Sequence, residues 1–389
     1  MITIKSKLMK RKHHFNFSYP VVLLLSLSLT IFSSVISAKI SIPEQFAKYA
    51  SYFVMHESIY TEITELKIRL MKKYGNNLPD NIFQKSGSAN DILRSDEINL
   101  KDTPPDILKT QKKLAEDFLT DKYKKDGVVI ENNYSTAQAT DIFGNVAVRN
   151  VTADTEIDVE EILNSDFSLP ITDFSDPLVL IYHTHSTESY LPVNNGVFSS
   201  DYPTRNDSKN SNMIRIGEEI CNILESNGIR TIHDRKIHDK QYTGAYDRSR
   251  ETINGILEKY PSIIITLDIH RDAIYYDDVT RIKPTAEIDG KKAAQLMIIA
   301  GAEGGTVTDF PNWQTNLSFA LNLHNYVNTQ YKDLMKPVYF CNRKYNMDIT
   351  PYSLLIETGT DVNTLEEAAY SARLLGSALA KLIKEKADD

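Results

Sequence analysis

Cysteine is nearly absent from this chain of 389 residues. Its two cysteines, Cys221 and Cys341, are too few for a disulfide framework or a four-cysteine zinc site. Any bound metal ion must therefore be held by histidine and carboxylate side chains. An excess of positive charge is also missing, because 44 Lys and Arg stand against 52 Asp and Glu, a net charge of -8. Since phosphate recognition needs a basic face, this balance argues against a nucleic-acid-binding protein.

Long apolar runs are rare, and one of them lies near the N-terminus. Residues 21–38 carry no charge and follow a segment rich in Lys and Arg. As a helix these 18 residues would span about 27 Å, close to the hydrocarbon thickness of a bilayer, and the basic flank favours a cytoplasmic N-terminus. We therefore expect residues 1–40 to form a single-pass membrane anchor, with the rest extracytoplasmic. A cleaved signal peptide is the alternative, since Val35 and Ser37 suit a cleavage site.

The sequence pattern changes near residue 176. Residues 41–175 have irregular apolar spacing and polar, proline-interrupted stretches, which predict a partly helical stalk or a partner-binding segment. After residue 176, apolar runs alternate with amphipathic segments. Strands are predicted at 178–182, 229–233, 262–269, 296–300 and 354–356, and helices at 212–227, 246–259, 316–328 and 364–384. Residues 176–389 are therefore expected to form a three-layer α/β domain.

Three predicted strands end in residues that can bind a metal ion or transfer a proton. The first runs into His183, His185 and Glu188, the strongest into His270, and the last into Glu357. Because α/β sheets gather their sites at strand ends, we expect these side chains to meet. Two histidines and one glutamate are a common ligand set for catalytic zinc. His185, Glu188 and His270 are the predicted ligands, and Glu357 is the predicted general base.

Neighbouring residues leave alternatives open. His183 rivals His185, because alternate residues of a strand point to the same face. Asp268 would orient an imidazole or serve as a buried structural carboxylate. Arg271 would bind a substrate carboxylate or pair with an adjacent aspartate. A serine nucleophile is disfavoured, because the chain has no G-x-S-x-G motif.

Five strings in order resemble the stage II sporulation protein P family. They are LIYHTHSTESYLP, GIRTIHDRKIHD, LDIHRDA, FPNW and LLIETGTDVNT, and the resemblance covers about residues 178–382. This family is similar to the zinc-dependent N-acetylmuramoyl-L-alanine amidases, whose fold is a mixed sheet flanked by helices. The resemblance therefore implies a mixed α/β sheet (phosphorylase/hydrolase-like), Zn²⁺ as the cofactor and peptidoglycan as the substrate.

The resemblance also assigns roles to individual residues. His185 and His270 match two zinc ligands, Glu357 matches the catalytic glutamate, and Asn363 matches the asparagine that follows it. The amidases take their glutamate ligand from the start of the helix that begins here near 210–212, where this chain has no glutamate. Glu188 is the natural substitute, because metallocarboxypeptidases, which look like relatives in fold, use His-x-x-Glu for two ligands.

The activity that the resemblance implies is hydrolysis of amide bonds in the cell wall. The bonds are that between N-acetylmuramic acid and L-alanine, and also peptide cross-links. Groove residues would be Arg271, Arg343, Asn316 and Trp313, with a core position as the alternative for Trp313. The resemblance further implies engulfment during sporulation, between forespore and mother cell, with stage II sporulation proteins D and M as partners. A catalytically silent wall-binding scaffold and a metallocarboxypeptidase-like peptidase are the rival functions.

Overall fold

The computed structural model describes residues 99–387. They belong to one compact unit, which comprises residues 92–389. The predicted anchor at 21–38 and the first part of the expected stalk lie outside the described residues, so both remain predictions. No helix within 99–387 is both long enough and apolar enough to span a bilayer.

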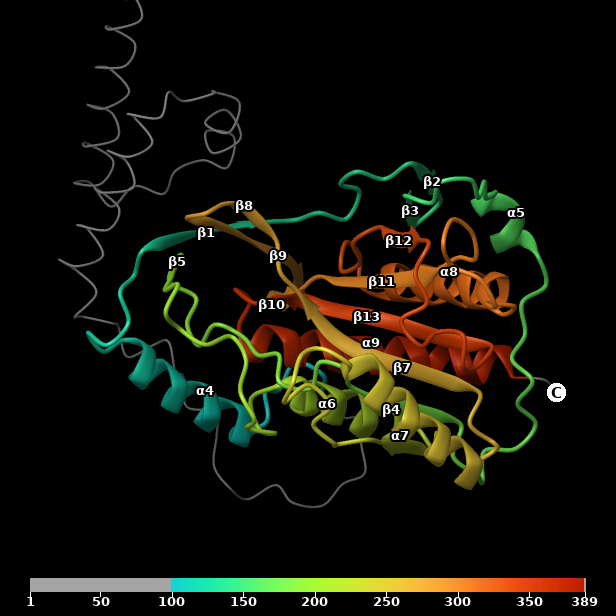
Figure 1. Ribbon diagram of the computed structural model, residues 1–389, viewed down its shortest axis with the longest axis horizontal. Helices are drawn as coiled ribbons and strands as arrows, with labels where there is room; N and C mark the ends of the chain where they lie inside the picture. The colour runs from blue at the N-terminus through green and yellow to red at the C-terminus, as the bar shows by residue number, and fades with distance from the viewer. Residues whose placement is uncertain (1–98, 388–389) are drawn as a thin grey trace, which may run out of the picture. The chain divides into compact units, whose positions relative to one another are not determined.

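An eight-stranded mixed sheet forms the centre of the described unit (Figure 1). Its strands, in spatial order, are β2 (Asp141–Phe143), β3 (Val146–Asn150), β12 (Val338–Cys341), β11 (Leu296–Gly301), β13 (Tyr352–Thr360), β7 (Ile265–Asp272), β4 (Val179–Tyr182) and β6 (Thr231–His233). The β2/β3 and β11/β13 pairs are antiparallel, and the other neighbours run parallel. The predicted mixed α/β sheet is therefore confirmed, and all five predicted strands are present.

Helices cover both faces of this sheet, because its central strands are apolar on both sides. In β4, Val179 and Ile181 belong to the largest buried cluster, whereas Leu180 and Tyr182 belong to a separate one, as the alternation of a strand requires. The first cluster includes α6 (Met213–Ser226), α8 (Trp313–Gln330) and α9 (Leu365–Lys386), and the second includes Ile253 of α7 (Ala245–Lys259). The layers are therefore helices, sheet and helix, as the sequence predicts.

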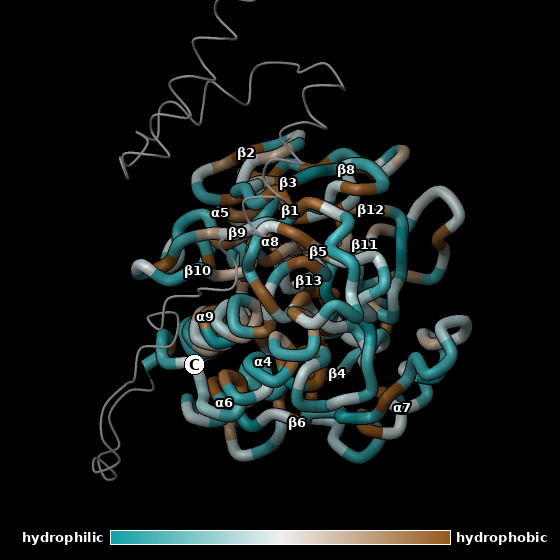
Figure 2. Tube along the Cα trace, turned by 90° about the vertical axis from the view of Figure 1, so that its left-hand side faces the viewer, coloured by the Kyte–Doolittle hydropathy of each residue, from teal (hydrophilic) through white to brown (hydrophobic). Residues whose placement is uncertain are grey.

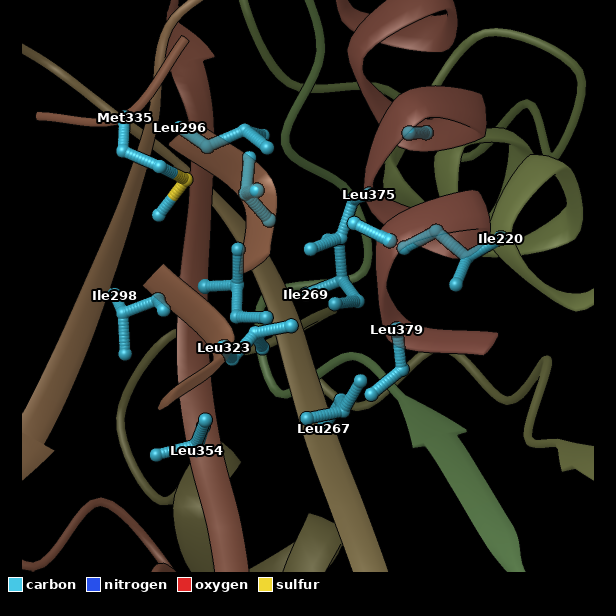
Figure 3. Close-up of a cluster of buried hydrophobic side chains, with 14 of the residues drawn as sticks. Ile220, Leu267, Ile269, Leu296, Ile298, Leu323, Met335, Leu354, Leu375 and Leu379 are labelled. Carbon is cyan, nitrogen blue, oxygen red and sulfur yellow. The ribbon is translucent and has the colours of Figure 1, made fainter. Parts of the chain in front are cut away.

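The core between β7 and α9 shows how the sheet is held. Leu267 and Ile269 of β7 lie beside Leu375 and Leu379 of α9 in one buried cluster (Figure 3). The last helix begins with the predicted capping box, in which Thr364 and Glu367 satisfy each other's backbone N–H groups. Figure 2 colours the chain by hydropathy, with hydrophobic residues in the central strands and hydrophilic residues in the surrounding loops.

A second, smaller sheet was not predicted from the sequence. It runs β10 (Lys291–Ala294), β9 (Thr280–Ile288), β1 (Gly127–Asn132) and β5 (Val197–Phe198), and β8 (Tyr275–Asp277) pairs with β9. The segment 275–294 contains many charged residues, and Pro284 stands within β9. Such a composition does not resemble an interior strand, so the local pattern does not reveal β9.

The structure also corrects the domain boundary predicted at residue 176. Strand β3 pairs in parallel with β12 of the main sheet, and β1 pairs with β9 of the second sheet. Helix α4 (Pro105–Phe118) buries Ile107 in the main core, and α5 (Val159–Asn164) packs Val159 into it. Residues 99–175 are therefore part of the folded unit rather than a stalk. Strands β1 and β3 pair with segments far along the chain, which local periodicity cannot reveal.

Candidate metal and proton-transfer site

The predicted site residues meet at one edge of the main sheet. His185 and Glu188 follow β4, His270 lies in β7, and Glu357 lies in β13. In the parallel register of β13 and β7, Glu357 is the direct partner of His270, and β4 pairs with the other side of β7. Three adjacent parallel strands thus carry all four residues to the same edge, which is the usual position of a site in an α/β sheet.

Glu188 and His270 have the spacing of two ligands of one zinc ion. Oε2 of Glu188 is 3.6 Å from Nδ1 of His270. Two ligand atoms on a tetrahedral zinc, at bonds of about 2.0–2.1 Å, lie about 3.3–3.4 Å apart. The other ring nitrogen of His270, Nε2, is 2.9 Å from Oδ1 of Asp268. A carboxylate behind the imidazole is the arrangement that orients histidine ligands of metal ions.

The charges around this pair favour a cation. Burial disfavours the imidazolium form of His270, but Asp268 and Glu188 outweigh burial and hold the pKa of His270 well above its ordinary value. Burial likewise opposes ionisation of Glu188, but His270 and Arg271 outweigh it and lower the pKa of Glu188 to about 2. Surroundings that stabilise a proton on His270 also stabilise a metal cation that replaces that proton.

His185 lies beside His270 and has a carboxylate of its own. The two ring centroids are 5.4 Å apart, with planes at 88°. Nδ1 of His185 is buried without a hydrogen-bond partner and lies 3.7 Å from Oδ2 of Asp239. The N–H and the hydroxyl of Thr187 donate to Asp239 at 3.1 and 2.6 Å. Asp239 was missed from the sequence, although it ends the second Ile-His-Asp of IHDRKIHD.

The side chains of His185, Glu188 and His270 are of the types that bind zinc. Two imidazoles and one carboxylate are a standard set for zinc, the Glu188–His270 spacing suits one ion, and His185 has a buried nitrogen without a partner. Among residues 99–387, no three His, Cys, Asp or Glu side chains stand in a complete metal-binding arrangement. His185, Glu188 and His270 are therefore the residues that would hold the ion. This assignment rests on the chemistry of their side chains and on the distance between Glu188 and His270.

Both ring nitrogens of His183 contact groups outside this cluster. Its Nδ1 is 3.0 Å from the carbonyl oxygen of Ile269, and its Nε2 is 2.9 Å from Nε2 of His233. Burial, with His233 as the next contribution, holds the pKa of His183 well below its ordinary value. Both ring nitrogens already have protein partners, so the structure favours His185 over His183 as a ligand.

A backbone bulge positions Glu357. The register of β13 against β7 shifts between Glu357 and Thr360, and Gly359 has a φ of +70°. A Cβ on Gly359 would lie 2.6 Å from Oδ1 of Asn363, which accepts a hydrogen bond from the Thr360 N–H at 2.8 Å. Gly359 and Asn363 thus have a structural role, because they shape the end of β13.

The carboxyl of Glu357 is suited to proton transfer. Its Oε2 is buried and has no hydrogen-bond partner among the described residues. Burial, followed by the charge of Asp272, raises the pKa of Glu357 to about 8. A carboxyl whose pKa lies near neutrality can both take up and give back a proton during a reaction.

The Arg271 side chain holds main-chain segments together. It is buried, and its guanidinium donates to three main-chain carbonyl oxygens, those of Ser189, Asp272 and Thr204, at 3.2, 3.3 and 2.9 Å. These bonds tie the loop after β4 to the loop around residue 204. The structure therefore does not favour the predicted contact between Arg271 and a substrate carboxylate.

Two other predicted groove residues belong to the core. The Asn316 amide is buried and bonds to the main chain of Met347 and Ser353 at 2.7 and 3.0 Å. Trp313 packs against Phe340 with ring centroids 5.9 Å apart, which agrees with the alternative stated for it. Arg343 is exposed, on the loop that also carries Tyr345.

Tyrosines that the sequence reasoning missed line one side of the histidine pair. Tyr242 stacks on His185, with centroids 4.6 Å apart and planes at 4°. Tyr246, in the first turn of α7, meets His185 edge-on at 5.7 Å and lies nearly parallel to His270 at 6.5 Å. Tyr345 lies 5.4 Å from Tyr246. For Tyr242 and Tyr246, the signal available in the sequence was their position shortly after IHDRKIHD, at a spacing of four residues.

Arg205 joins the two carboxylates of the cluster. Its Nη2 is 2.9 Å from Oε1 of Glu188, and its Nη1 is 2.8 Å from Oδ2 of Asp239. The guanidinium carbon also lies 5.3 Å from the ring centroid of Tyr242. Arg205 therefore fixes the Glu188 carboxylate through the oxygen that does not face His270.

Comparison with known proteins identifies the family. The family model described as stage II sporulation protein P matches residues 72–380. The chain belongs to the stage II sporulation protein P family. It is 30% identical to stage II sporulation protein P of Bacillus subtilis over 217 residues, which are 53% of this chain and 51% of that protein. The chain thus spans about half the length of this curated relative.

The solved structures that resemble this chain include two amidases. The N-acetylmuramoyl-L-alanine amidase AmiC2 of Nostoc punctiforme is 14% identical, with a TM-score of 0.33, and the match covers 54% of this chain and 96% of that one. The CwlD amidase of Clostridioides difficile, in complex with the GerS lipoprotein, is 11% identical, with a TM-score of 0.36, covering 54% and 99%.

Proposed function

We propose that this protein is a zinc-dependent peptidoglycan hydrolase that cleaves the amide between N-acetylmuramic acid and L-alanine, and also peptide cross-links. Its family membership supports the cell wall as the substrate. The observation that carries the proposal is the position of Glu357, a carboxyl with a buried, unpaired oxygen and a pKa raised to about 8. It lies on the strand next to His270, at the edge where His185 and Glu188 also lie.

Zinc is the proposed cofactor, held by His185, Glu188 and His270. When bound, it supplies Lewis-acid chemistry that polarises a carbonyl and makes a water molecule more acidic. The protein's own contribution is to fix its donors before the ion arrives. Asp268 lies beside Nε2 of His270, Asp239 lies beside Nδ1 of His185, and Arg205 fixes Glu188.

Proton transfer is assigned to Glu357. In its ionised form the carboxylate takes a proton from the attacking water, and in its protonated form it gives the proton to the departing nitrogen. The buried, unpartnered Oε2 leaves this carboxyl free for both transfers. The glycine-containing bulge after Glu357 keeps the side chain at the strand end, where the ligand residues lie.

The arginines beside Glu188 separate the amidase from a carboxypeptidase-like peptidase. A carboxypeptidase needs a cation free to bind the terminal carboxylate of its substrate. Arg271 is committed to three main-chain carbonyls, and Arg205 is shared by two carboxylates. This arrangement favours cleavage of an internal amide. A silent scaffold is disfavoured, because such a protein would not need the unpaired Glu357 carboxyl.

Location and partners are part of the same proposal. An anchor at residues 21–38 would attach the protein to the cell membrane, with the folded unit outside the cytoplasm. Stage II sporulation proteins D and M are the proposed partners during engulfment, in the space between forespore and mother cell. These assignments follow from the sequence resemblance and the apolar run.

Digestion of purified sacculi tests the proposed activity. The wild-type chain should release whole stem peptides from the glycan strands, and mass spectrometry of the products should show new L-alanine N-termini. Glu357→Gln should lower the rate by about 10²–10⁴-fold, the usual contribution of general acid–base catalysis. Glu287→Gln, on the exposed side of β9, is the matched control and should digest normally. Release of single amino acids in place of stem peptides would support the peptidase instead.

A further inference from the structure

The fold leaves one face of Tyr242 open at the edge of the candidate site. Its side chain is 65% exposed, whereas His185, on which it stacks, is 7% exposed. Tyr275 and Tyr276 of β8 are about as exposed, but Tyr242 differs from them because it lies directly against a candidate metal ligand. We propose that the outer face of Tyr242 is a subsite for a sugar ring of the glycan strand. This inference rests on the proposed function, since it specifies which part of peptidoglycan the site recognises.

The Tyr242 ring is held rigidly, as a binding platform requires. One face is backed by the His185 imidazole at 4.6 Å, in nearly parallel planes. The loop that carries it is tied to α7 by Arg248, whose guanidinium donates to the carbonyl oxygens of His238 at 2.6 Å and Thr243 at 3.2 Å. A ring fixed before the ligand arrives loses little conformational entropy on binding, which favours affinity.

The arginine beside the ring is not free to bind an anionic ligand. The guanidinium carbon of Arg205 lies 5.3 Å from the ring centroid of Tyr242. Its guanidinium is shared between the carboxylates of Glu188 and Asp239, so one positive charge faces two negative ones. Arg205 is therefore already paired and does not offer a free guanidinium to a carboxylate of a stem peptide. The face of an N-acetylated sugar is uncharged and presents C–H groups that can cover an aromatic ring.

A position beside His185 also suits the geometry of the substrate. The scissile amide joins a sugar to a peptide, so a sugar-binding surface has to lie next to the reacting groups. Tyr242 contacts a predicted zinc ligand directly, whereas Tyr246 and Tyr345 behind it are partly buried. The exposed ring is thus placed to hold the glycan side of the substrate while the amide lies over the cluster.

Equilibrium binding of two soluble probes tests the proposal with the full chain. The probes are a peptide-free oligosaccharide of N-acetylglucosamine and a free stem tetrapeptide, and calorimetry gives both dissociation constants. Tyr242→Ala should weaken oligosaccharide binding by about fivefold or more, the equivalent of one aromatic stacking contact. Tyr242→Phe should bind as the wild type does. Tyr276→Ala is the control, because Tyr276 is 77% exposed on β8 in the other sheet.

The outcomes separate this proposal from simpler explanations. Equal oligosaccharide binding by wild type and Tyr242→Ala, or no binding by the wild type, would overturn it, as would a loss confined to the tetrapeptide. Metal content is measured on each variant, and a Tyr242→Ala protein that loses both metal and binding would show a structural role only. Neither probe contains the amide that the protein is proposed to cleave, so the binding experiment is independent of the proposed activity. If sacculi are not digested but sugar binding still depends on Tyr242, the proposed hydrolase is rejected and the proposed sugar subsite is retained.

Discussion

Oδ1 of Asp268 lies 2.9 Å from Nε2 of His270, two residues farther along the same strand. Asp268 is completely buried and accepts hydrogen bonds from the N–H and hydroxyl of Thr184 at 2.8 and 2.6 Å. The carboxylate is therefore fixed from the β4 side of the sheet, and the imidazole lies beside it at ion-pair distance. Because one ring nitrogen of His270 faces Asp268, the other is left to face Glu188.

Replacing this carboxylate should weaken metal binding without unfolding the protein. Asp268→Asn keeps an oxygen that can accept from Thr184, but removes the charge beside His270. We expect zinc affinity to fall by about 10- to 100-fold, the usual effect of losing a carboxylate behind a histidine ligand. Competition with a chromophoric chelator measures the affinity. Asp141→Asn, on the far edge strand β2, should leave it unchanged, and an equal affinity for Asp268→Asn would remove Asp268 from the site.

The two neighbouring histidines should behave differently. His185→Ala should lose stoichiometric zinc, because its unpartnered nitrogen lies at the cluster. His183→Ala should retain zinc and instead lose stability, because it leaves buried partners at Ile269 and His233 without their hydrogen bonds. Elemental analysis and thermal unfolding of both purified variants measure the two effects. Loss of zinc from the His183 variant alone would reverse the assignment.

Glu357 should make the stability of the metal-free protein depend on pH. Its folded pKa is raised to about 8 from an ordinary value of 4.5, so between these values the folded protein holds a proton that the unfolded chain has lost. Stability from this group is therefore present below about pH 4.5 and falls as the pH rises towards 8. Glu357→Gln removes this pH-dependent loss of stability, because glutamine does not titrate. With metal removed by a chelator, the melting temperature of the variant should therefore exceed that of the wild type by a margin that grows from pH 5 to pH 8. A constant difference across this range would contradict the raised pKa.

A pair of helical glycines tests the packing behind the site. A Cβ on Gly217 of α6 would lie 2.6 Å from Nε2 of His183 and 2.7 Å from Nε2 of His233, whereas a Cβ on Gly255 of α7 would meet nothing within 4 Å. Gly217→Ala should destabilise the protein by about 1–3 kcal/mol through overpacking. Gly255→Ala should stabilise it by about 0.5–1 kcal/mol, because alanine is the better helix former. Denaturant unfolding of both variants measures these changes, and equal effects would mean that the His183–His233 contact is not tightly packed.

The sequence predicted those parts of the molecule that depend on local pattern. Continuous apolar runs located β4, β7 and β13, and the residues directly after or within them located His185, His270 and Glu357. The second sheet escaped prediction because β1 and β9 lie about 150 residues apart and pair only through the tertiary fold. Asp239 and Arg205 escaped for the same reason, since only the folded loops bring them to His185 and Glu188.

Digestion of purified sacculi by the full chain, before and after exhaustive chelation, measures whether the release of stem peptides depends on a bound metal ion. We expect that the chelated protein releases no stem peptides, that added zinc restores their release, and that zinc restores nothing in the His185→Ala and Glu357→Gln variants. Undiminished release of stem peptides by the fully chelated wild-type protein would contradict a metal-dependent site at His185, Glu188 and His270.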